Sequence, residues 1–98
     1  MIIRVIKSAR DVVAVCDSDL IGRRFEEGDL QLDIKENFYG KEKFSEPEAM
    51  IILKKMQRED ATFNIVGKKS INTALKAGII EKGWVKEVKG VPFALVLL

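Results

Sequence analysis

Hydrophobic and polar positions in the first part of the chain predict two strands joined by a turn. Residues 2–7 are rich in β-branched side chains, as strands are. Residues 12–16 form an unbroken apolar run of strand length, which is typical of a central strand buried on both faces. Residues 8–11 have the composition of a turn, so the two strands are candidates for a hairpin.

A short helix and a half-exposed strand are predicted next. Residues 17–19 are three good N-cap residues in a row, and they predict a helix over 20–27 that ends at Gly28. Residues 30–35 alternate between apolar and polar side chains, which predicts a strand with one face in the core. The side chains expected in that core are Leu30, Leu32 and Ile34. Residues 36–44 carry no regular pattern.

The sharpest local signal is the start of a long helix at Ser45. Ser45 and Glu48 form a capping box, in which the Ser45 hydroxyl accepts from the backbone of Glu48 and the Glu48 carboxylate reaches back. Phe44 precedes the box and is placed to pack on Ala49 as a hydrophobic staple. Helical spacing of apolar residues continues to about Arg58. The predicted inward positions are Ala49, Ile52, Leu53 and Met56.

A strand over 61–66, a helix over 70–77, a short strand over 84–88 and a last strand over 91–97 complete the pattern. Because strands alternate with helices, the sequence predicts the α/β class. We expect a single small domain over 1–98, with a mixed sheet of about five or six strands and about three helices packed on it. The last strand is strongly apolar, and as an edge strand it would pair with another chain.

Composition narrows the classes of function. The 98 residues include no histidine and one cysteine, so one chain holds no Ser–His–Asp triad, no Cys–His pair, no His-ligated zinc and no internal disulfide. The net charge of +2 is too small to imply a nucleic-acid partner by itself. Basic residues interrupt the N-terminus, and the longest apolar run is far below the roughly 20 residues of a membrane helix. We therefore expect a soluble cytoplasmic protein without a membrane partner.

Residues 37–44 interleave aromatic and basic side chains on a predicted loop. Aromatic rings stack on unpaired bases and lysines neutralise phosphates, so this stretch is a candidate for binding RNA or another partner. The alternative is that its rings simply fill the end of the core. The candidate residues are Tyr39, Lys41 and Lys43, with Arg23 and Arg24 as outlying members.

The turn over 67–70 is a candidate for binding an anion. It lies between a predicted strand and a predicted helix, where free backbone N–H groups, the helix dipole and two ammonium groups favour a phosphate or a carboxylate. The nucleotide P-loop pattern fails, because Thr62 and Lys69 stand where it needs a glycine and a Ser or Thr. The candidate residues are Gly67, Lys68, Lys69 and Ser70. The alternative is an ordinary turn with an N-cap and two solvated lysines.

Four aspartates and the lone cysteine give weaker candidates. Aspartate oxygens suit Mg²⁺, but the spacing matches no EF-hand pattern, and capping or strand alternation explains most of the set. These residues are Asp17, Asp19, Asp29 and Asp33. Cys16 ends a predicted buried strand beside a predicted helix start, which favours a reactive thiol, yet a small buried hydrophobe is the simpler interpretation. We expect no metal, no cofactor and no catalytic residue.

Four segments taken together resemble a known family. They are Cys-Asp-Ser-Asp-Leu-Ile-Gly-Arg-Arg-Phe-Glu-Glu-Gly-Asp-Leu over 16–30, Asn-Phe-Tyr-Gly over 37–40, Asn-Ile-Val-Gly over 64–67 and Gly-Val-Pro over 90–92. In this order they are similar to a family of small archaeal proteins known only as a domain of unknown function. The resemblance implies one α/β domain in an archaeal cytoplasm, with no assigned activity, cofactor or substrate. It also implies a histidine after the last proline in many members, where this chain has Phe93, so an enzymatic role loses support.

The leading hypothesis is a non-enzymatic module that binds RNA or a protein, with a link to archaeal translation or RNA handling. In this hypothesis the Tyr39 ring stacks on a base while Lys41 and Lys43 meet phosphates. The alternative is a small-ligand protein or enzyme that holds a phosphate-like anion at 67–70, with Asp17 and Asp19 near a metal. A third possibility is assembly of copies through the last strand.

Overall fold

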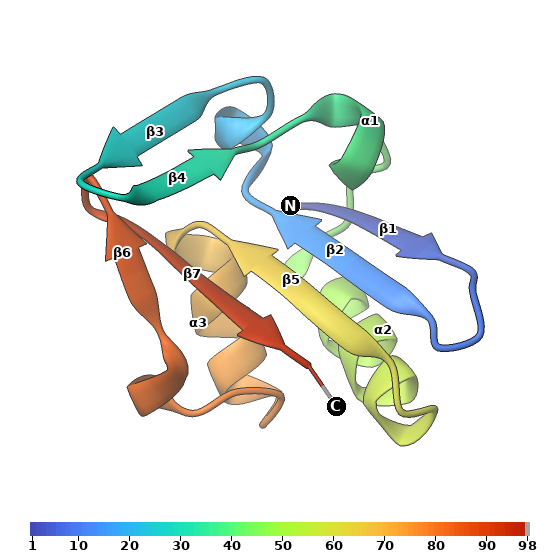
Figure 1. Ribbon diagram of the computed structural model, residues 1–98. Helices are drawn as coiled ribbons and strands as arrows, with labels where there is room; N and C mark the ends of the chain where they lie inside the picture. The colour runs from blue at the N-terminus through green and yellow to red at the C-terminus, as the bar shows by residue number, and fades with distance from the viewer. Residues whose placement is uncertain (98) are drawn as a thin grey trace.

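Five strands form a mixed sheet that is the middle layer of the molecule (Figure 1). We describe residues 1–97 from a computed structural model. The strands are β1 (Ile2–Ile6), β2 (Val12–Cys16), β5 (Thr62–Val66), β6 (Lys86–Val88) and β7 (Val91–Val96). Their order across the sheet is β1-β2-β5-β7-β6. β2 and β5 run parallel, and the other neighbouring pairs run antiparallel, which confirms the predicted mixed sheet.

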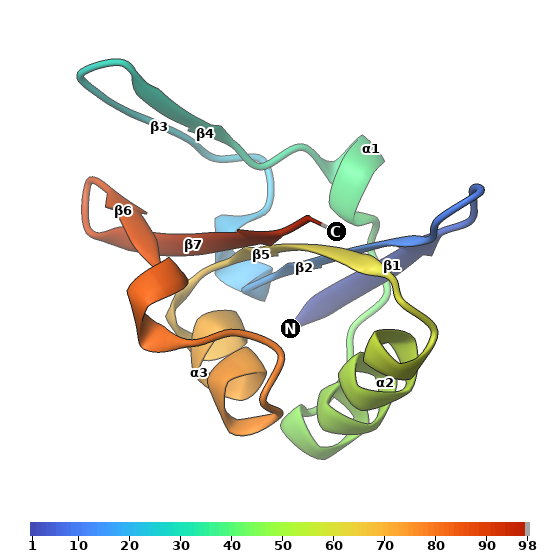
Figure 2. The ribbon, with the colours of Figure 1, turned by 60° about the horizontal axis from the view of Figure 1, so that its bottom comes forward.

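Helices cover one face of this sheet, and a hairpin covers part of the other (Figure 2). The two long helices share one face, whereas a two-stranded sheet and a short helix lie on the opposite face. These elements are α2 (Glu46–Arg58) and α3 (Lys68–Lys76), then β3 (Arg24–Glu27), β4 (Leu30–Asp33) and α1 (Glu36–Tyr39), with 3₁₀ turns η1 (Ser18–Leu20) and η2 (Lys82–Trp84). The α/β class is confirmed. None of the helices in the described part is long and apolar enough to cross a membrane.

Each face of the sheet has its own apolar core, because successive side chains of a strand point to opposite faces. Val13 and Val15 of β2 join the core beneath α2 and α3, whereas Ala14 and Cys16 join the core beneath the hairpin. All four side chains are fully buried. The prediction of a central strand buried on both faces is therefore confirmed, and β1 pairs with it as a hairpin.

The capping box starts α2 as the sequence predicts. The Ser45 N–H donates to Glu48 Oε1 at 2.8 Å, and the Ser45 hydroxyl accepts from the Glu48 N–H at 3.3 Å. The hydrogen bond from the Ser45 backbone holds the pKa of Glu48 below its usual value. The helix ends at Arg58, and Phe44 packs against the core that contains Ala49. The buried positions of the helix are Ala49, Leu53 and Met56.

The helix predicted over 20–27 is wrong. The chain makes only the turn η1 and then enters β3, which pairs antiparallel with β4. Gly28 ends no helix; with φ of +60° it takes the first place of a two-residue hairpin turn, because Glu27 pairs with Leu30. Phe25 packs against the core beneath this hairpin. Burial of that ring and pairing with β4 outweigh a local helical preference.

Smaller differences occur at the ends of elements. Leu32 and Ile34 are buried as predicted, but Leu30 lies next to the hairpin turn and is 46% exposed. The stretch 36–44, predicted as irregular, contains α1. The strand predicted over 84–88 is shorter, because η2 occupies its start.

The last strand is not the edge that the sequence analysis assumed. β7 pairs with β5 on one side and with the three residues of β6 on the other. The chain reaches β6 first and then turns back at Lys89 and Gly90, so β7 is inserted between the two. The edges of the sheet are β1 and β6. The expectation that β7 offers a free edge along its length is therefore wrong.

Candidate functional site: a basic groove beside the edge strand

The aromatic member of the predicted RNA site is buried. Tyr39 ends α1 with only 6% of its side chain exposed, and its ring meets that of Phe38 edge to face with centroids 5.0 Å apart. Burial raises the pKa of Tyr39 to about 12. The ring belongs to the core beneath the hairpin and does not stand out on the surface loop, so the role expected for Tyr39 as an exposed stacking ring is corrected.

The two lysines of the same stretch remain on the surface. The segment that carries them follows the start of β1, where the Ile3 N–H donates to the Glu42 carbonyl at 3.2 Å. Lys41 and Lys43 are both exposed there. Lys41 Nζ lies 3.5 Å from a carboxylate oxygen of Glu36 in an exposed ion pair. These cations therefore border the β1 edge of the sheet.

The two arginines lie elsewhere. The Arg23 guanidinium stands 4.9 Å from the centroid of the Phe25 ring, and Arg24 pairs with Glu26 at 2.6 Å. Arg24 begins β3 and pairs with Asp33 at the end of β4, whereas the other end of β3 approaches the β6–β7 turn, where the Lys89 N–H donates to Glu27 (Figure 1). Within the described residues, no hydrogen bond, ion pair or shared hollow joins either arginine to Lys41 or Lys43, so no contact assembles the predicted set at one place.

The carboxylate of Asp17 binds the backbone N–H groups at the start of α3. Asp17 follows β2 and is 6% exposed. Its Oδ1 accepts from the Ser70 N–H at 2.8 Å and from the Ser70 hydroxyl at 2.7 Å, while its Oδ2 accepts from the Lys69 N–H at 3.1 Å. Gly67 stands so close that a Cβ on it would lie 2.3 Å from Asp17 Cγ. Asp17 therefore caps α3 from the end of the neighbouring strand β2, with favourable charge at the helix N-terminus.

The predicted anion turn borders a hollow of about 290 Å³. Lys68 and Lys69 line this hollow, and so does the exposed Asp19. The backbone donors that would hold an external phosphate at Lys69 and Ser70 already serve Asp17. What remains for a ligand is the two exposed ammonium groups of Lys68 and Lys69, in a hollow that Asp17 and Asp19 also line. This is a weaker anion site than the one predicted from the sequence, which included free backbone donors.

Neither the candidate metal-binding aspartates nor Cys16 lies, within the described residues, in an arrangement suited to metal binding or catalysis. Within residues 1–97, no group of three or more Cys, Asp and Glu side chains is placed to hold a metal ion. Asp33 instead lies 3.6 Å from the Lys35 ammonium group. Burial raises the pKa of Cys16 to about 12, so its thiol stays protonated and unreactive near neutral pH.

A larger groove runs between β1 and α2. Its volume is about 610 Å³, and its floor is apolar. The floor consists of Ile3, Val5, Phe44, Ile52 and Met56. Gly40, four basic residues and one acidic residue complete the lining, the charged ones being Arg4, Lys7, Lys41, Lys55 and Glu42. This basic groove is the candidate functional site, and of the predicted residues it includes Lys41.

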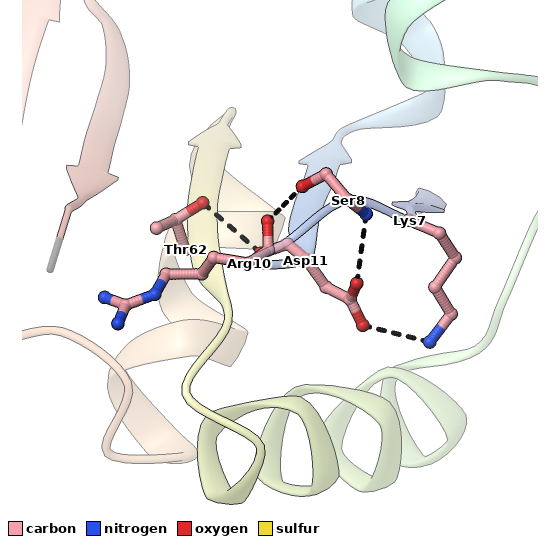
Figure 3. A network of polar contacts seen from close by, with 5 residues as sticks. All are labelled: Lys7, Ser8, Arg10, Asp11 and Thr62. Atoms are coloured by element: carbon pink, nitrogen blue, oxygen red, sulfur yellow. Dashed lines mark hydrogen bonds and ion pairs between the residues drawn. The ribbon is translucent and has the colours of Figure 1, made fainter.

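A network of polar contacts at the β1–β2 turn positions one of these cations (Figure 3). Asp11 accepts from the Ser8 N–H at 3.3 Å and from Lys7 Nζ at 2.9 Å. The hydrogen bond raises the pKa of Lys7 and lowers the pKa of Asp11. The Asp11 carbonyl also accepts from the Thr62 hydroxyl at 3.4 Å, which ties the turn to β5. The ammonium group of Lys7 is thereby held at one end of the basic groove.

Part of the β1 edge faces this groove without a partner strand. The Ile3 N–H points away from β2 toward Glu42, so Ile3 is in a non-hydrogen-bonded pair with Val15. By the same alternation, the N–H and C=O of Val5 point outward. Within the described residues, the segment beside β1 covers only its first half, through a bridge between Ile2 and Lys43.

Sequence reasoning missed most of the basic groove. Arg4 and Lys7 were visible only as basic residues that interrupt an apolar N-terminus. The one usable signal was a basic residue within the predicted first strand, because such a charge is typical of a strand at the edge of a sheet. Nothing local indicates that α2 would lie opposite this strand.

The fold and these sites define a small three-layer α/β domain with a groove at one sheet edge and, in residues 1–97, no assembled metal cluster. The chain belongs to the family described as Protein of unknown function (DUF424), whose model matches residues 6–98. This confirms the resemblance drawn from the sequence. The fold is similar to that in the crystal structure of an uncharacterized conserved protein from Methanopyrus kandleri, with a TM-score of 0.86 and 22% identity over 97% of this chain and 88% of that one. No curated protein matches the sequence.

Proposed function

We propose that this protein is a non-enzymatic binding module that holds an acidic, extended segment of a partner protein in the basic groove. The observation that carries the proposal is the unpaired second half of β1, which faces α2 across an apolar floor. An extended peptide adds to such an edge by main-chain hydrogen bonds, and its alternate side chains enter the groove. Val5 supplies the free N–H and C=O for this pairing.

Charge supports an acidic partner. Arg4, Lys7, Lys41 and Lys55 surround the groove, against the single carboxylate of Glu42. The ion pair of Lys41 with Glu36 is exposed on both sides, and such a pair contributes little in water, so a bound carboxylate competes with it easily. The exposed ammonium group of Lys7 pairs with the less exposed Asp11. Lys55 makes no ion pair with a described residue and is the most available cation.

RNA is the competing partner. If RNA is the partner, the proposal includes a link to archaeal translation or RNA handling. Phosphates would be attracted by the same four cations. The groove offers one aromatic ring, the half-buried Phe44, so it lacks the exposed stacking platform that unpaired bases use. An acidic peptide therefore has better support here, and oligomerisation would need a copy of this chain to present such a segment.

The alternative of a small anion at 67–70 has less support, because Asp17 already occupies the donors of Lys69 and Ser70. Titration with inorganic phosphate tests it by thermal shift. A rise in the unfolding temperature that Lys68→Ala abolishes would restore this alternative.

The test uses a labelled peptide of alternating Glu and Val, with a Lys and Val peptide of the same length as its control, followed by fluorescence anisotropy. Val5→Pro removes the outward N–H at an edge position where proline is tolerated, and Val5→Ala is the matched variant that keeps it. We expect Val5→Pro to weaken binding of the acidic peptide at least about tenfold, or about 1.4 kcal/mol, relative to Val5→Ala. Lys55→Glu should weaken it by a similar factor without touching the strand edge.

The outcomes are distinct. Equal binding of both peptides, or equal affinity of the two Val5 variants, would refute strand addition in the groove. Tight binding of single-stranded RNA that falls log-linearly with salt, combined with no peptide binding, would favour RNA instead. Thermal unfolding checks that each variant is folded. If Val5→Pro does not fold, Lys55→Glu still tests the charge argument.

A further inference from the structure

A second hollow, separate from the basic groove, lies between the sheet and the layer formed by β4 and α1. Its volume is about 410 Å³, within the usual range of small-ligand sites. Its wall is mainly apolar and includes Ile34, Phe38, Phe93 and Leu95. It opens on the face of the sheet opposite to α2 and α3. Two of the four segments that carry the family resemblance contribute to its lining, through Phe38 and Asn64.

Asn64 gives this hollow a specific polar group. It lies in the middle of β5, between Ala14 of β2 and Leu95 of β7, on the face that the hollow borders. Asparagine is disfavoured in central strands, and every described neighbour of Asn64 in this row is apolar. The Asn64 side chain is half-buried and makes no hydrogen bond with the described residues. Its amide therefore presents one donor group and one acceptor to whatever fills the hollow.

Two aromatic rings line the same hollow as this amide. Phe38 and Phe93 are each half-buried, and both line the hollow. Rings in such positions stack on planar bases, and an amide can bond bidentately to the adjacent donor and acceptor of adenine. Lys35 lies at the rim, where its exposed pair with Asp33 at 3.6 Å can yield to a phosphate.

From this geometry we propose that the hollow binds an adenine base, held between apolar walls and read by the Asn64 amide. The base can belong to a free adenine nucleotide or to an unpaired position in RNA, since both present the same ring edge. The proposal does not rest on the groove between β1 and α2, whose lining shares no residue with this hollow.

The test is titration of the isotope-labelled protein with AMP, UMP, oligo(A) and oligo(U), followed by NMR chemical shifts. AMP and oligo(A) should shift the Asn64 side-chain amide and the residues around Phe93, whereas UMP should have a much smaller effect. If oligo(A) binds at least about tenfold more tightly than AMP, the base comes from RNA; similar affinities identify a free nucleotide. Both results support the adenine site.

Asn64→Leu keeps the approximate size of the side chain and removes its hydrogen bonds. We expect it to lower the AMP affinity at least about tenfold, while Lys55→Glu in the other groove leaves that affinity unchanged. Absence of any shift with AMP at millimolar concentration, equal binding of UMP, or full affinity of Asn64→Leu would each overturn the proposal. If Asn64→Leu does not fold, Phe93→Leu replaces it, because loss of the stacking ring makes the same prediction.

Discussion

Gly67→Ala is expected to destabilise the fold strongly through its contact with Asp17. Gly67 has φ of +108°, a conformation that residues with a side chain rarely adopt. A Cβ at this position would lie 2.3 Å from Asp17 Cγ and 2.6 Å from each carboxylate oxygen. The carboxylate cannot stay where it is, so its hydrogen bonds to the start of α3 must break or distort.

The magnitude follows from two contributions. A non-glycine residue held at such a backbone angle costs about 1–3 kcal/mol. Displacing Asp17 affects two backbone N–H bonds to a charged acceptor, each of which contributes about 1.5–3 kcal/mol. Because relaxation recovers part of this loss, we expect a decrease of about 3–5 kcal/mol in the free energy of unfolding. That is a large share of the roughly 5–15 kcal/mol typical of a domain.

The assay is urea unfolding followed by circular dichroism, arranged as a double-mutant cycle. Gly67→Ala is measured in the wild-type chain and in Asp17→Ala, where no carboxylate opposes the new methyl group. In the second background only the backbone cost of about 1–3 kcal/mol should remain. Gly83→Ala is the control, because a Cβ at Gly83 meets no atom within 4 Å. Equal costs in both backgrounds would show that Asp17 is not what makes a glycine necessary at 67, and the reasoning would be refuted.

Three further predictions concern caps, cores and buried acids. Ser45→Ala should lower the free energy of unfolding by about 1 kcal/mol through loss of the capping box, and an unchanged urea midpoint would contradict this. Leu53→Ala should cost about 2–5 kcal/mol in the same assay, because Leu53 is fully buried, whereas Ile51→Ala on the exposed side of α2 should change it by less than about 0.5 kcal/mol. Burial raises the pKa of both Cys16 and Tyr39 to about 12 from ordinary values of 9.0 and 10.0, so the unfolded chain loses these protons first and stability should fall as pH rises from about 9 to 12. Cys16→Ala should reduce that fall, and urea midpoints that do not change with pH would exclude this origin.

Local patterns predicted the elements whose signals lie within a few neighbouring residues. The capping box at Ser45 and the apolar spacing up to Arg58 define α2 without help from the rest of the chain. The apolar run over β2 predicted burial on both faces, because only a strand covered on both sides tolerates it. The α/β class follows from the alternation of such elements.

Contacts with other elements decided the structure of the segments whose own signals were ambiguous. Asp17 has the residue type of a local N-cap, yet its carboxylate caps α3, which starts about fifty residues later in the chain. The stretch that includes Phe25 became a strand because β4 was available to pair with it. Tyr39 resembled an exposed stacking ring in sequence, but the hairpin layer covers it. Single-sequence patterns carry no information about which distant segment will supply a partner.

The sequence by itself determined the long helix α2, the buried strand β2 and the α/β class, and it excluded histidine-based chemistry within these 98 residues. Tertiary structure alone decided that β7 lies inside the sheet, that β1 faces α2 across a basic groove, and that Asn64 lines the same hollow as two aromatic rings. The physical reason is the distance along the chain over which each kind of interaction acts. Hydrogen bonding and side-chain preference within a turn act between near neighbours, whereas a groove is made by surfaces that meet only after strand order and register are fixed.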